Sequence, residues 1–181
     1  MERSCCSRCA EQLSALVWPR YRDVKLDCGV VVIADRHHRN WARLAREGHH
    51  EWDAEQFCSE YLRAGDHVVD VGAHVGMLVA VAGQCIGRSG RLLAFEPDVA
   101  NRYALFDTVR RHSLDQVSIF DVALSDRVGS ATLLRPDGAW GAFLEGTDGK
   151  STVVDSFFHS SRIDRSPVQI TTLDAFLADH P

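Results

Sequence analysis

The stretch Val68-Val69-Asp70-Val71-Gly72-Ala73-His74-Val75-Gly76 decides the fold of this chain. It begins with an apolar run after the Gly65-Asp66 break, and such a run is typical of a buried, central parallel strand. Gly72 and Gly76 follow, and glycine lets the backbone turn sharply and lie close to a ligand. Asp70 stands at the carboxyl end of the predicted strand, where open α/β sheets bind ligands. The stretch therefore predicts a strand, a glycine turn and a helix around a ligand site.

A second carboxylate follows at the spacing that a ribose-binding acid requires. The apolar run Leu92–Phe95 predicts a strand, and Glu96-Pro97 ends it, about one crossover helix after Gly76. A parallel neighbour of the Asp70 strand would bring Glu96 to the same edge of the sheet. The pair of acids therefore indicates a nucleoside-containing ligand.

The glycine spacing separates two classes of nucleotide ligand. A dinucleotide turn reads G-x-G-x-x-G, and its middle glycine lets a pyrophosphate approach the backbone. His74 occupies that middle position here, which counts against a nicotinamide dinucleotide oxidoreductase. The observed G-x-x-x-G after an acid is the turn that class I methyltransferases use for S-adenosylmethionine. Gly76 is expected to lie against that ligand, so that its replacement by Val would block the cofactor and leave most of the fold intact.

Composition limits the other classes of function. The chain has 181 residues, a formal net charge of -5 and 45% hydrophobic residues, which suits one soluble domain. No dense Lys/Arg block is present, so nucleic acid is not expected as a partner. No apolar stretch is long enough to span a bilayer and no signal peptide is convincing, so no membrane partner is expected and the cytoplasm is the expected compartment.

The cysteines do not indicate a metal site. The cluster Cys5-Cys6-x-x-Cys9 contains one C-x-x-C pair, and no second pair follows to complete a four-ligand zinc site. Cys58 and Cys85 fall in apolar helical contexts and are expected to be reduced core residues.

The chain divides into a lead-in and one domain. Residues 1–20 are expected to be poorly ordered, and residues 21–181 to form a single domain with an N-terminal hairpin and helix (21–63) and a cofactor-binding core (64–181). Further elements follow from periodicity and from turn and cap residues. They are a hairpin over Val24–Ala34, helices over Glu51–Arg63, Met77–Ile86, from Asp98 onward and over Leu173–Ala178, strands over Val117–Val122, Ala131–Leu134 and Val168–Thr171, and an irregular loop from Arg135 to Ser166.

Two helices carry explicit predictions about their buried faces. In the helix over Glu51–Arg63, apolar residues at helical spacing are expected to face the core. In the helix after Asp98, Arg102 is expected to point to water. The predicted core residues are Phe57, Cys58, Tyr61 and Leu62 in the first helix, and Val99, Tyr103, Phe106 and Val109 in the second.

These motifs together resemble the FkbM family of S-adenosylmethionine-dependent methyltransferases. The resemblance runs from about Val30 to the C-terminus and rests on five pieces in order: Gly65-Asp66, Val69 to Gly76, Ala94-Phe95-Glu96-Pro97, Ala123-Leu124-Ser125-Asp126 and Thr171-Thr172-Leu173-Asp174. It implies an α/β chain with a Rossmann-like class I methyltransferase fold, in three α/β/α layers. It also implies methyl transfer, usually to a hydroxyl oxygen of a small molecule or glycan-type acceptor.

The resemblance assigns roles to particular residues. Asp70, Gly72 and Gly76, within the motif that also holds Ala73 and His74, would lie beside the methionine part of the cofactor. Glu96 would bind the ribose hydroxyls, Pro97 would lie at the adenine edge, and Asp121 would be a further adenine contact. His74 stands where the family usually has Asn, and either side chain can hydrogen-bond the cofactor's tail. No residue is identified as the general base.

Members of the family normally continue past the Thr-Leu-Asp piece into a further strand, and this sequence stops at Pro181. The sheet is therefore expected to be incomplete at the C-terminus, with self-association through its open edge. Two alternatives to an O-methyltransferase stay open: a non-catalytic S-adenosylmethionine-binding fragment, and an NAD-dependent oxidoreductase.

Overall fold

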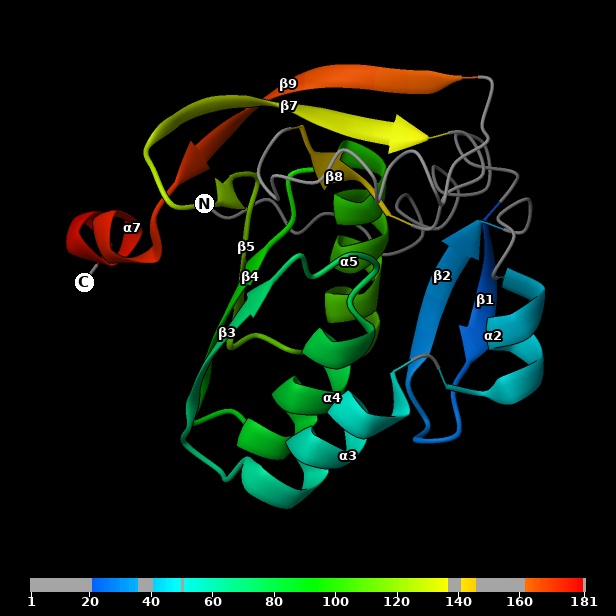
Figure 1. Cartoon of the computed structure of the whole chain (residues 1–181). Coiled ribbons are helices and arrows are strands. Elements are labelled where there is room, and N and C mark those ends of the chain that lie inside the picture. The colour runs from blue at the N-terminus through cyan, green and yellow to red at the C-terminus, as the bar shows by residue number, and fades with distance from the viewer. Residues whose placement is uncertain (1–20, 36–40, 50, 137–140, 146–161, 181) are drawn as a thin grey trace, which may run out of the picture.

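The computed structural model describes residues 21–35, 41–49, 51–136, 141–145 and 162–180. The predicted lead-in at residues 1–20, with Cys5, Cys6 and Cys9, lies outside these ranges. Within them, a parallel sheet with helices on both faces lies beside an N-terminal hairpin (Figure 1). No helix in the described ranges is long and apolar enough to cross a membrane.

The central sheet has three parallel strands in the order β3-β4-β5. They are β3 (His67–Val71), β4 (Arg91–Phe95) and β5 (Val117–Phe120). In the register, Asp70 pairs with Ala94, and Phe95 pairs with both Val71 and Phe120. The three strands therefore end at one edge, which is the top of the sheet in Figure 1.

Helices α3 (Trp52–Tyr61), α4 (Met77–Ile86) and α5 (Val99–Arg111) cover one face of this sheet (Figure 1). Leu92 and Ala94 of β4 point toward α4 and α5, while Leu93 and Phe95 point to the opposite face. On that opposite face lies α7 (Leu173–Asp179), whose Phe176 packs against Phe95. The three-layer α/β/α arrangement expected from the sequence is therefore confirmed.

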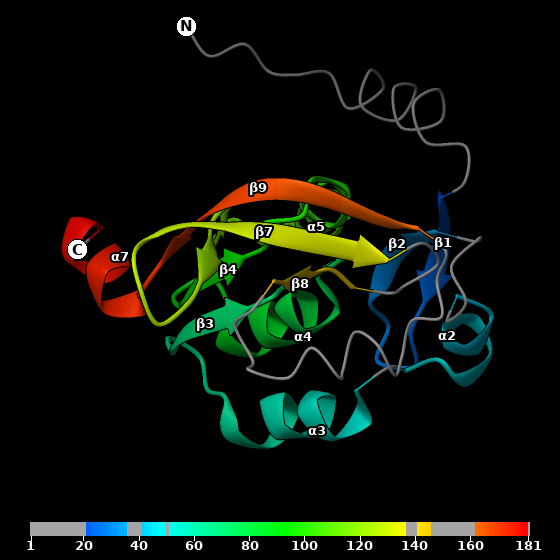
Figure 2. The ribbon, with the colours of Figure 1, turned by 45° about the horizontal axis from the view of Figure 1, so that its top comes forward.

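A second sheet lies beyond the carboxyl ends of the central strands (Figure 2). Its order is β6-β9-β7-β8, and we call the long antiparallel pair of β7 and β9 the ribbon. Its strands are β6 (Ala123–Leu124), β7 (Gly129–Pro136), β8 (Phe143–Leu144) and β9 (Ile163–Thr171). Part of the predicted irregular loop from Arg135 to Ser166 is therefore strand, because β9 begins at Ile163 and pairs along β7; residues 137–140 and 146–161 lie outside the described ranges.

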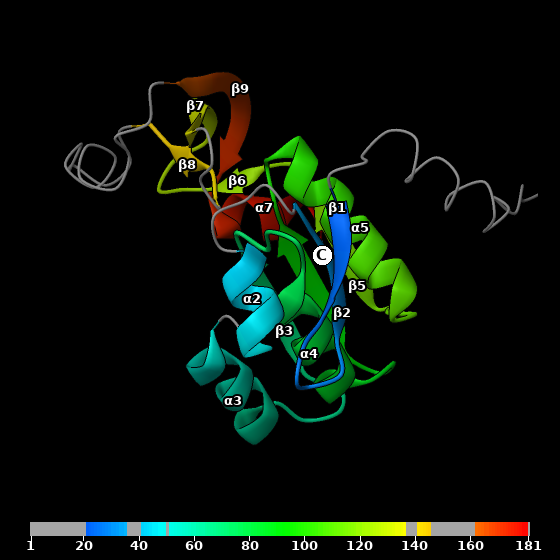
Figure 3. The ribbon, with the colours of Figure 1, turned by 90° about the vertical axis from the view of Figure 1, so that its right-hand side faces the viewer.

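The N-terminal hairpin consists of β1 (Tyr21–Lys25) and β2 (Val31–Asp35), followed by α2 (Trp41–Glu47). It lies beside α4 and α5 (Figure 3), and its apolar residues share a core with them. His112, at the end of α5, bonds through Nε2 to the backbone of Val31 at 3.0 Å. The hairpin was predicted from the sequence over Val24–Ala34, whereas no periodicity predicted α2.

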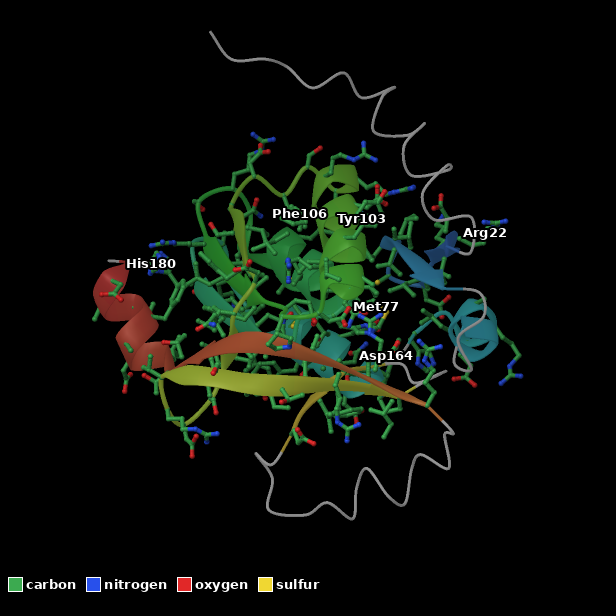
Figure 4. All side chains as sticks on the ribbon, turned by 90° about the horizontal axis from the view of Figure 1, so that it is seen from above. Arg22, Met77, Tyr103, Phe106, Asp164 and His180 are labelled. Atoms are coloured by element: carbon green, nitrogen blue, oxygen red, sulfur yellow. The ribbon has the colours of Figure 1, made fainter. Side chains whose placement is uncertain are left out.

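The structure corrects part of the predicted faces of two helices. The residues that pack against the core as predicted are Cys58, Leu62, Tyr103 and Val109. In α5 the buried residues are Ala100, Ala104, Leu105 and Thr108, while Phe106 is 55% exposed and Val99 is exposed. Figure 4 labels Tyr103 and Phe106 on this helix. In α3, Phe57 and Tyr61 stack on each other at the surface with ring centroids 4.7 Å apart, and Glu55 is buried instead. Leu105 and Thr108 of α5 face inward, toward Gly76 of the turn.

The strand β3 is also less buried than predicted. Among the described residues it pairs only with β4, so it is an edge strand and not a central one. Val69 and Val71 point to the face that α3 and α4 do not cover and are exposed, Val71 by 60%.

Candidate functional site

The candidate site is the edge at which the three parallel strands end. Asp70 lies one residue before the end of β3, Glu96 follows β4, and Asp121 follows β5. Because Phe95 and Phe120 are register partners, Glu96 and Asp121 are neighbours across the sheet. The structure therefore brings together the three acidic residues that the sequence assigned to the cofactor.

The turn after β3 is held against the end of β4 by its own amides. Gly72 and Ala73 both donate to the carbonyl of Phe95, at 2.9 and 3.0 Å. The backbone N–H of His74 donates to Glu96 Oε2 at 2.8 Å. The glycine motif and the second acid are thus parts of one hydrogen-bonded unit, which fixes where Glu96 lies.

Gly72 has the properties of a ligand cradle. Its φ of +80° is a conformation that only glycine adopts without strain, and a Cβ built there would meet no atom within 4 Å. Gly72 and Val71 are both exposed, so the backbone at this point faces open space. A ligand can therefore approach the main chain here.

Gly76 differs from this expectation. Its φ is +87°, and a Cβ there would lie 2.7 Å from Leu105 Cδ1 and 3.3 Å from Thr108. The missing side chain of Gly76 therefore makes room for α5. These contacts argue against the prediction that Gly76→Val leaves most of the fold intact, because a side chain at this φ is strained and displaces Leu105.

His74 has a φ of +53°, which is the left-handed region. Asn, Asp and His are enriched among the non-glycine residues found there. This conformation gives a backbone reason for Asn or His at the position, independent of any contact that the ring makes with a ligand.

Glu96 is 5% exposed, and both of its carboxylate oxygens accept hydrogen bonds from the backbone. In addition to His74, the N–H of Asp98 donates to Oε1 at 2.8 Å. Burial raises the pKa of Glu96 to about 7, while the His74 amide, the Asn101 side chain, Arg102 and Arg135 act in the opposite direction. Each carboxylate oxygen has a second lone pair, so the same group can accept ribose hydroxyls.

Asp70 lies on the side of β3 that faces α3. Burial raises the pKa of Asp70 to about 6, and the negative charge of Glu51 adds to that effect. A carboxyl group whose ionisation is disfavoured by its own fold is characteristic of functional sites. Asp70 is therefore placed to gain when a ligand supplies a positive charge or hydrogen-bond donors.

Pro97 and Asp121 line a cleft of about 690 Å³ between the start of α5 and the ribbon. The cleft is lined by charges of both signs. These are Asp98 and Arg102 near the start of α5, Asp121 after β5, and Arg135, Asp164 and Arg165 from the ribbon. Figure 4 looks down on this end of the molecule and labels Asp164 on β9. Arg135, Asp164 and Arg165 were not predicted as site residues, because they lie in the segment expected to be a loop.

The described residues contain no cluster of His, Cys, Asp and Glu suited to a metal ion. Cys58 and Cys85 are free and partly buried, and burial together with neighbouring Cys85 raises the pKa of the Cys58 thiol.

Comparison with known proteins places this site in context. A model of the Methyltransferase FkbM domain matches residues 70–181. No curated protein matches the chain significantly. A methyltransferase FkbM from Methylobacillus flagellatus is 12% identical, covers 75% of this chain and 40% of its own, and has a TM-score of 0.37.

Two further solved structures are similar to this chain. TYW2 from M. jannaschii, solved in complex with AdoMet, is 13% identical over 61% of this chain and 52% of its own, with a TM-score of 0.46. An S-adenosylmethionine-dependent O-methyltransferase from Thermotoga maritima is 11% identical over 64% of this chain and 71% of its own, with a TM-score of 0.38. Against the first solved structures that it matches, this chain spans between 37% and 52% of their length.

Proposed function

Because this chain belongs to the FkbM methyltransferase family, we propose that it binds S-adenosylmethionine and transfers its methyl group to a hydroxyl oxygen of a small-molecule or glycan-type acceptor. The family is the one that the sequence motifs indicated. The observation that carries the cofactor proposal is the position of Asp70, Glu96 and Asp121 at the ends of three adjacent parallel strands, beside the open backbone at Gly72.

The proposed binding mode takes the roles that the family resemblance implies, and the geometry of these residues supports it. Glu96 accepts the two ribose hydroxyls, Asp70 and the turn from Gly72 to Gly76 face the methionine part, and Pro97 and Asp121 border the adenine. A nucleoside without phosphates suits this edge, since the amides of Gly72, Ala73 and His74 already bond to Phe95 and Glu96. Those amides are not available to cradle a pyrophosphate, which argues against a dinucleotide.

The chemistry asks the protein mainly for positioning. The cofactor supplies an electrophilic methyl group, and the acceptor oxygen must lie in line with the methyl carbon and the sulfur. Holding the two reactants in this geometry lowers the activation barrier by roughly 7–11 kcal/mol. The acceptor loses its hydroxyl proton in the reaction, and no described residue is assigned as its base. We place the reaction in the cytoplasm.

Isothermal calorimetry with S-adenosylmethionine, S-adenosylhomocysteine and NAD tests the cofactor proposal. We expect the first two to bind and NAD not to bind. Glu96→Ala removes charge-assisted hydrogen bonds of about 1.5–3 kcal/mol, which corresponds to roughly a 10- to 160-fold loss of affinity. Glu145→Ala, an exposed acid on the second sheet that pairs with Arg165, is the matched control. Unchanged affinity in a folded Glu96→Ala protein would overturn the site.

A second candidate function is cofactor binding without catalysis. It is favoured by the central sheet, in whose described part β3 pairs with β4 alone. Transfer of a radiolabelled methyl group to a panel of hydroxylated sugars and small molecules separates the two functions. Cofactor binding with no transfer to any acceptor would support the non-catalytic alternative.

A further inference from the structure

Two buried carboxylates lie two residues apart at the start of α5. Glu96 is 5% exposed and Asp98 is 4% exposed. Asp98 caps the helix, with Oδ1 accepting from the N–H groups of Ala100 and Asn101 at 2.9 Å each. The N–H of Asp98 donates to Glu96 Oε1, so the two acids form one rigid loop. Two negative charges buried this closely require nearby cations.

The cations come from two different parts of the fold. Arg102, within α5, donates through Nη1 to the carbonyls of Glu96 and Pro97 at 2.9 and 3.0 Å. Arg135 comes from β7 of the ribbon and forms an ion pair with Asp98. Both guanidinium groups lower the pKa of Glu96, against the effect of burial. The ribbon therefore contributes one positive charge to the loop that carries the proposed ribose acid.

We propose that Arg135 is a positioning residue for the cofactor site: by pairing with Asp98 it fixes the loop before α5 that carries Glu96. This inference rests on the proposed function, in which Glu96 binds the ribose. Only the ionised carboxylate presents both oxygens as acceptors to two hydroxyls, because a protonated Glu96 turns one of them into a donor. The ribbon then acts on cofactor affinity without touching the ribose.

Further polar and charged groups lie next to Glu96 or line the adjoining cleft. The turn after β3 contributes the His74 amide, and α5 contributes the Asn101 side chain and Arg102. The end of β5 contributes Asp121, which is exposed, and β9 contributes Asp164 and Arg165 to the same cleft. Arg165 pairs with Glu145 at 3.5 Å. It is therefore a matched control for Arg135: the same side chain in the same cleft, with a different acid as its partner.

The test compares Arg135→Met with Arg135→Lys and Arg165→Met. The titration midpoint of the Glu96 carboxyl group is measured by NMR in the free protein, and S-adenosylhomocysteine binding is measured by calorimetry from pH 6 to pH 9. Arg135→Met is expected to raise the Glu96 midpoint by at most about half a pH unit, because Arg135 is the weakest of the groups that lower this pKa. From a wild-type midpoint of about 7, a rise of about half a unit weakens binding about twofold at pH 7 and leaves it nearly unchanged at pH 9.

Two control variants separate the role of Arg135 from other effects of the substitution. Arg135→Lys keeps the charge and is expected to keep the wild-type pH profile. Arg165→Met, in the lining of the same cleft, is expected to leave the Glu96 midpoint and the pH dependence of binding unchanged, whatever it does to the affinity itself. If Arg135→Met does not fold, Arg135→Gln is used in its place. Wild-type binding with an unshifted Glu96 midpoint in the variant, or an equal loss of affinity at every pH, overturns the role of Arg135. A shifted midpoint in a protein whose wild type does not bind S-adenosylhomocysteine instead overturns the proposed function.

Discussion

Asp70 keeps a carboxyl group half-buried at the end of β3, beside a second acid, Glu51. Its folded pKa of about 6 lies above the ordinary 3.8. The native state therefore binds more protons than the unfolded state between these values, and stability is lost as the pH rises through about 4 to 6. Asp70 thus destabilises the ligand-free protein at neutral pH, as is expected of a residue that serves binding.

The first prediction follows from this loss of stability when Asp70 ionises. Asp70→Asn is expected to raise the free energy of unfolding at pH 8 by about 1–3 kcal/mol and to leave it nearly unchanged at pH 4. The same substitution should weaken S-adenosylmethionine binding. Thermal unfolding at the two pH values measures the first effect and calorimetry the second. An equal change in stability at both pH values would show that ionisation of Asp70 is not the cause.

The two glycines of the turn give the second prediction. Gly72→Ala and Gly76→Ala both force a side chain into the left-handed region, which costs about 1–2 kcal/mol. Only Gly76→Ala also places a Cβ 2.7 Å from Leu105. We expect Gly76→Ala to lose at least about 1 kcal/mol more than Gly72→Ala in urea unfolding. Only the folded Gly72→Ala protein is expected to show a specific loss of cofactor affinity. Equal destabilisation by the two changes would contradict this assignment.

At the level of single residues, sequence reasoning identified acids and missed their partners. Asp70 and Glu96 are recognisable from the apolar runs beside them, which are a local signal, whereas Asp121 was indicated only by the family resemblance. Arg135 is separated from Asp98 by a helix and two strands, and its partner depends on the path of the ribbon. Arg102 was expected to point to water, because a charged residue on a helix carries no mark that it folds back on the preceding loop.

Among the elements, α7 has the clearest energetic role. Phe176 is 7% exposed, and its ring lies 4.8 Å from that of Phe95 and 4.6 Å from that of Phe120, edge to face in both pairs. Thr172 caps the helix by accepting from the N–H of Ala175 at 3.1 Å. The aromatic cluster lies on the face of the sheet opposite α4 and α5.

The third prediction concerns this cluster. Phe176→Ala is expected to lower the free energy of unfolding by about 3–5 kcal/mol, through lost burial and lost ring contacts. Leu177→Ala changes the next residue, which is 41% exposed, and is expected to cost well under half of that. Urea unfolding of the two variants measures the difference. Similar losses would mean that α7 is not packed on the sheet in solution.

Helices and strands were predictable where the sequence pattern is strong along the whole element. They were less predictable where contacts with distant residues decide which side chains are buried. Met77–Ile86 is apolar on all sides and is helical with the expected bounds. In α5 the apolar residues Val99 and Phe106 lie outside, while Leu105 and Thr108 face the turn at Gly76. Tertiary contacts decided which residues are inside, so periodicity alone predicted only part of the buried face. The ribbon strand β9 is polar along most of its length, so alternation did not indicate its first half.

For the whole molecule, the outer edge of β3 is the feature with the largest consequence. In the described part of the chain β3 pairs on one side only, and its exposed face carries Val69 and Val71. An exposed strand edge with apolar side chains is a template for pairing with another chain. An antiparallel pair about Val69 would place Val69 opposite its own copy, so the surface is self-complementary.

The last prediction is therefore that this chain associates with itself through β3. Light scattering in reducing buffer is expected to give an apparent mass that rises with protein concentration. Val71→Lys places a charge on the edge strand and is expected to keep the protein monomeric. Val128→Lys, another exposed valine (67% exposed, after the end of β6), is the control and should associate like the wild type. A wild-type protein that is monomeric at every concentration, or a Val71→Lys protein that associates as strongly, would show that the edge of β3 is not an interface between copies of the chain.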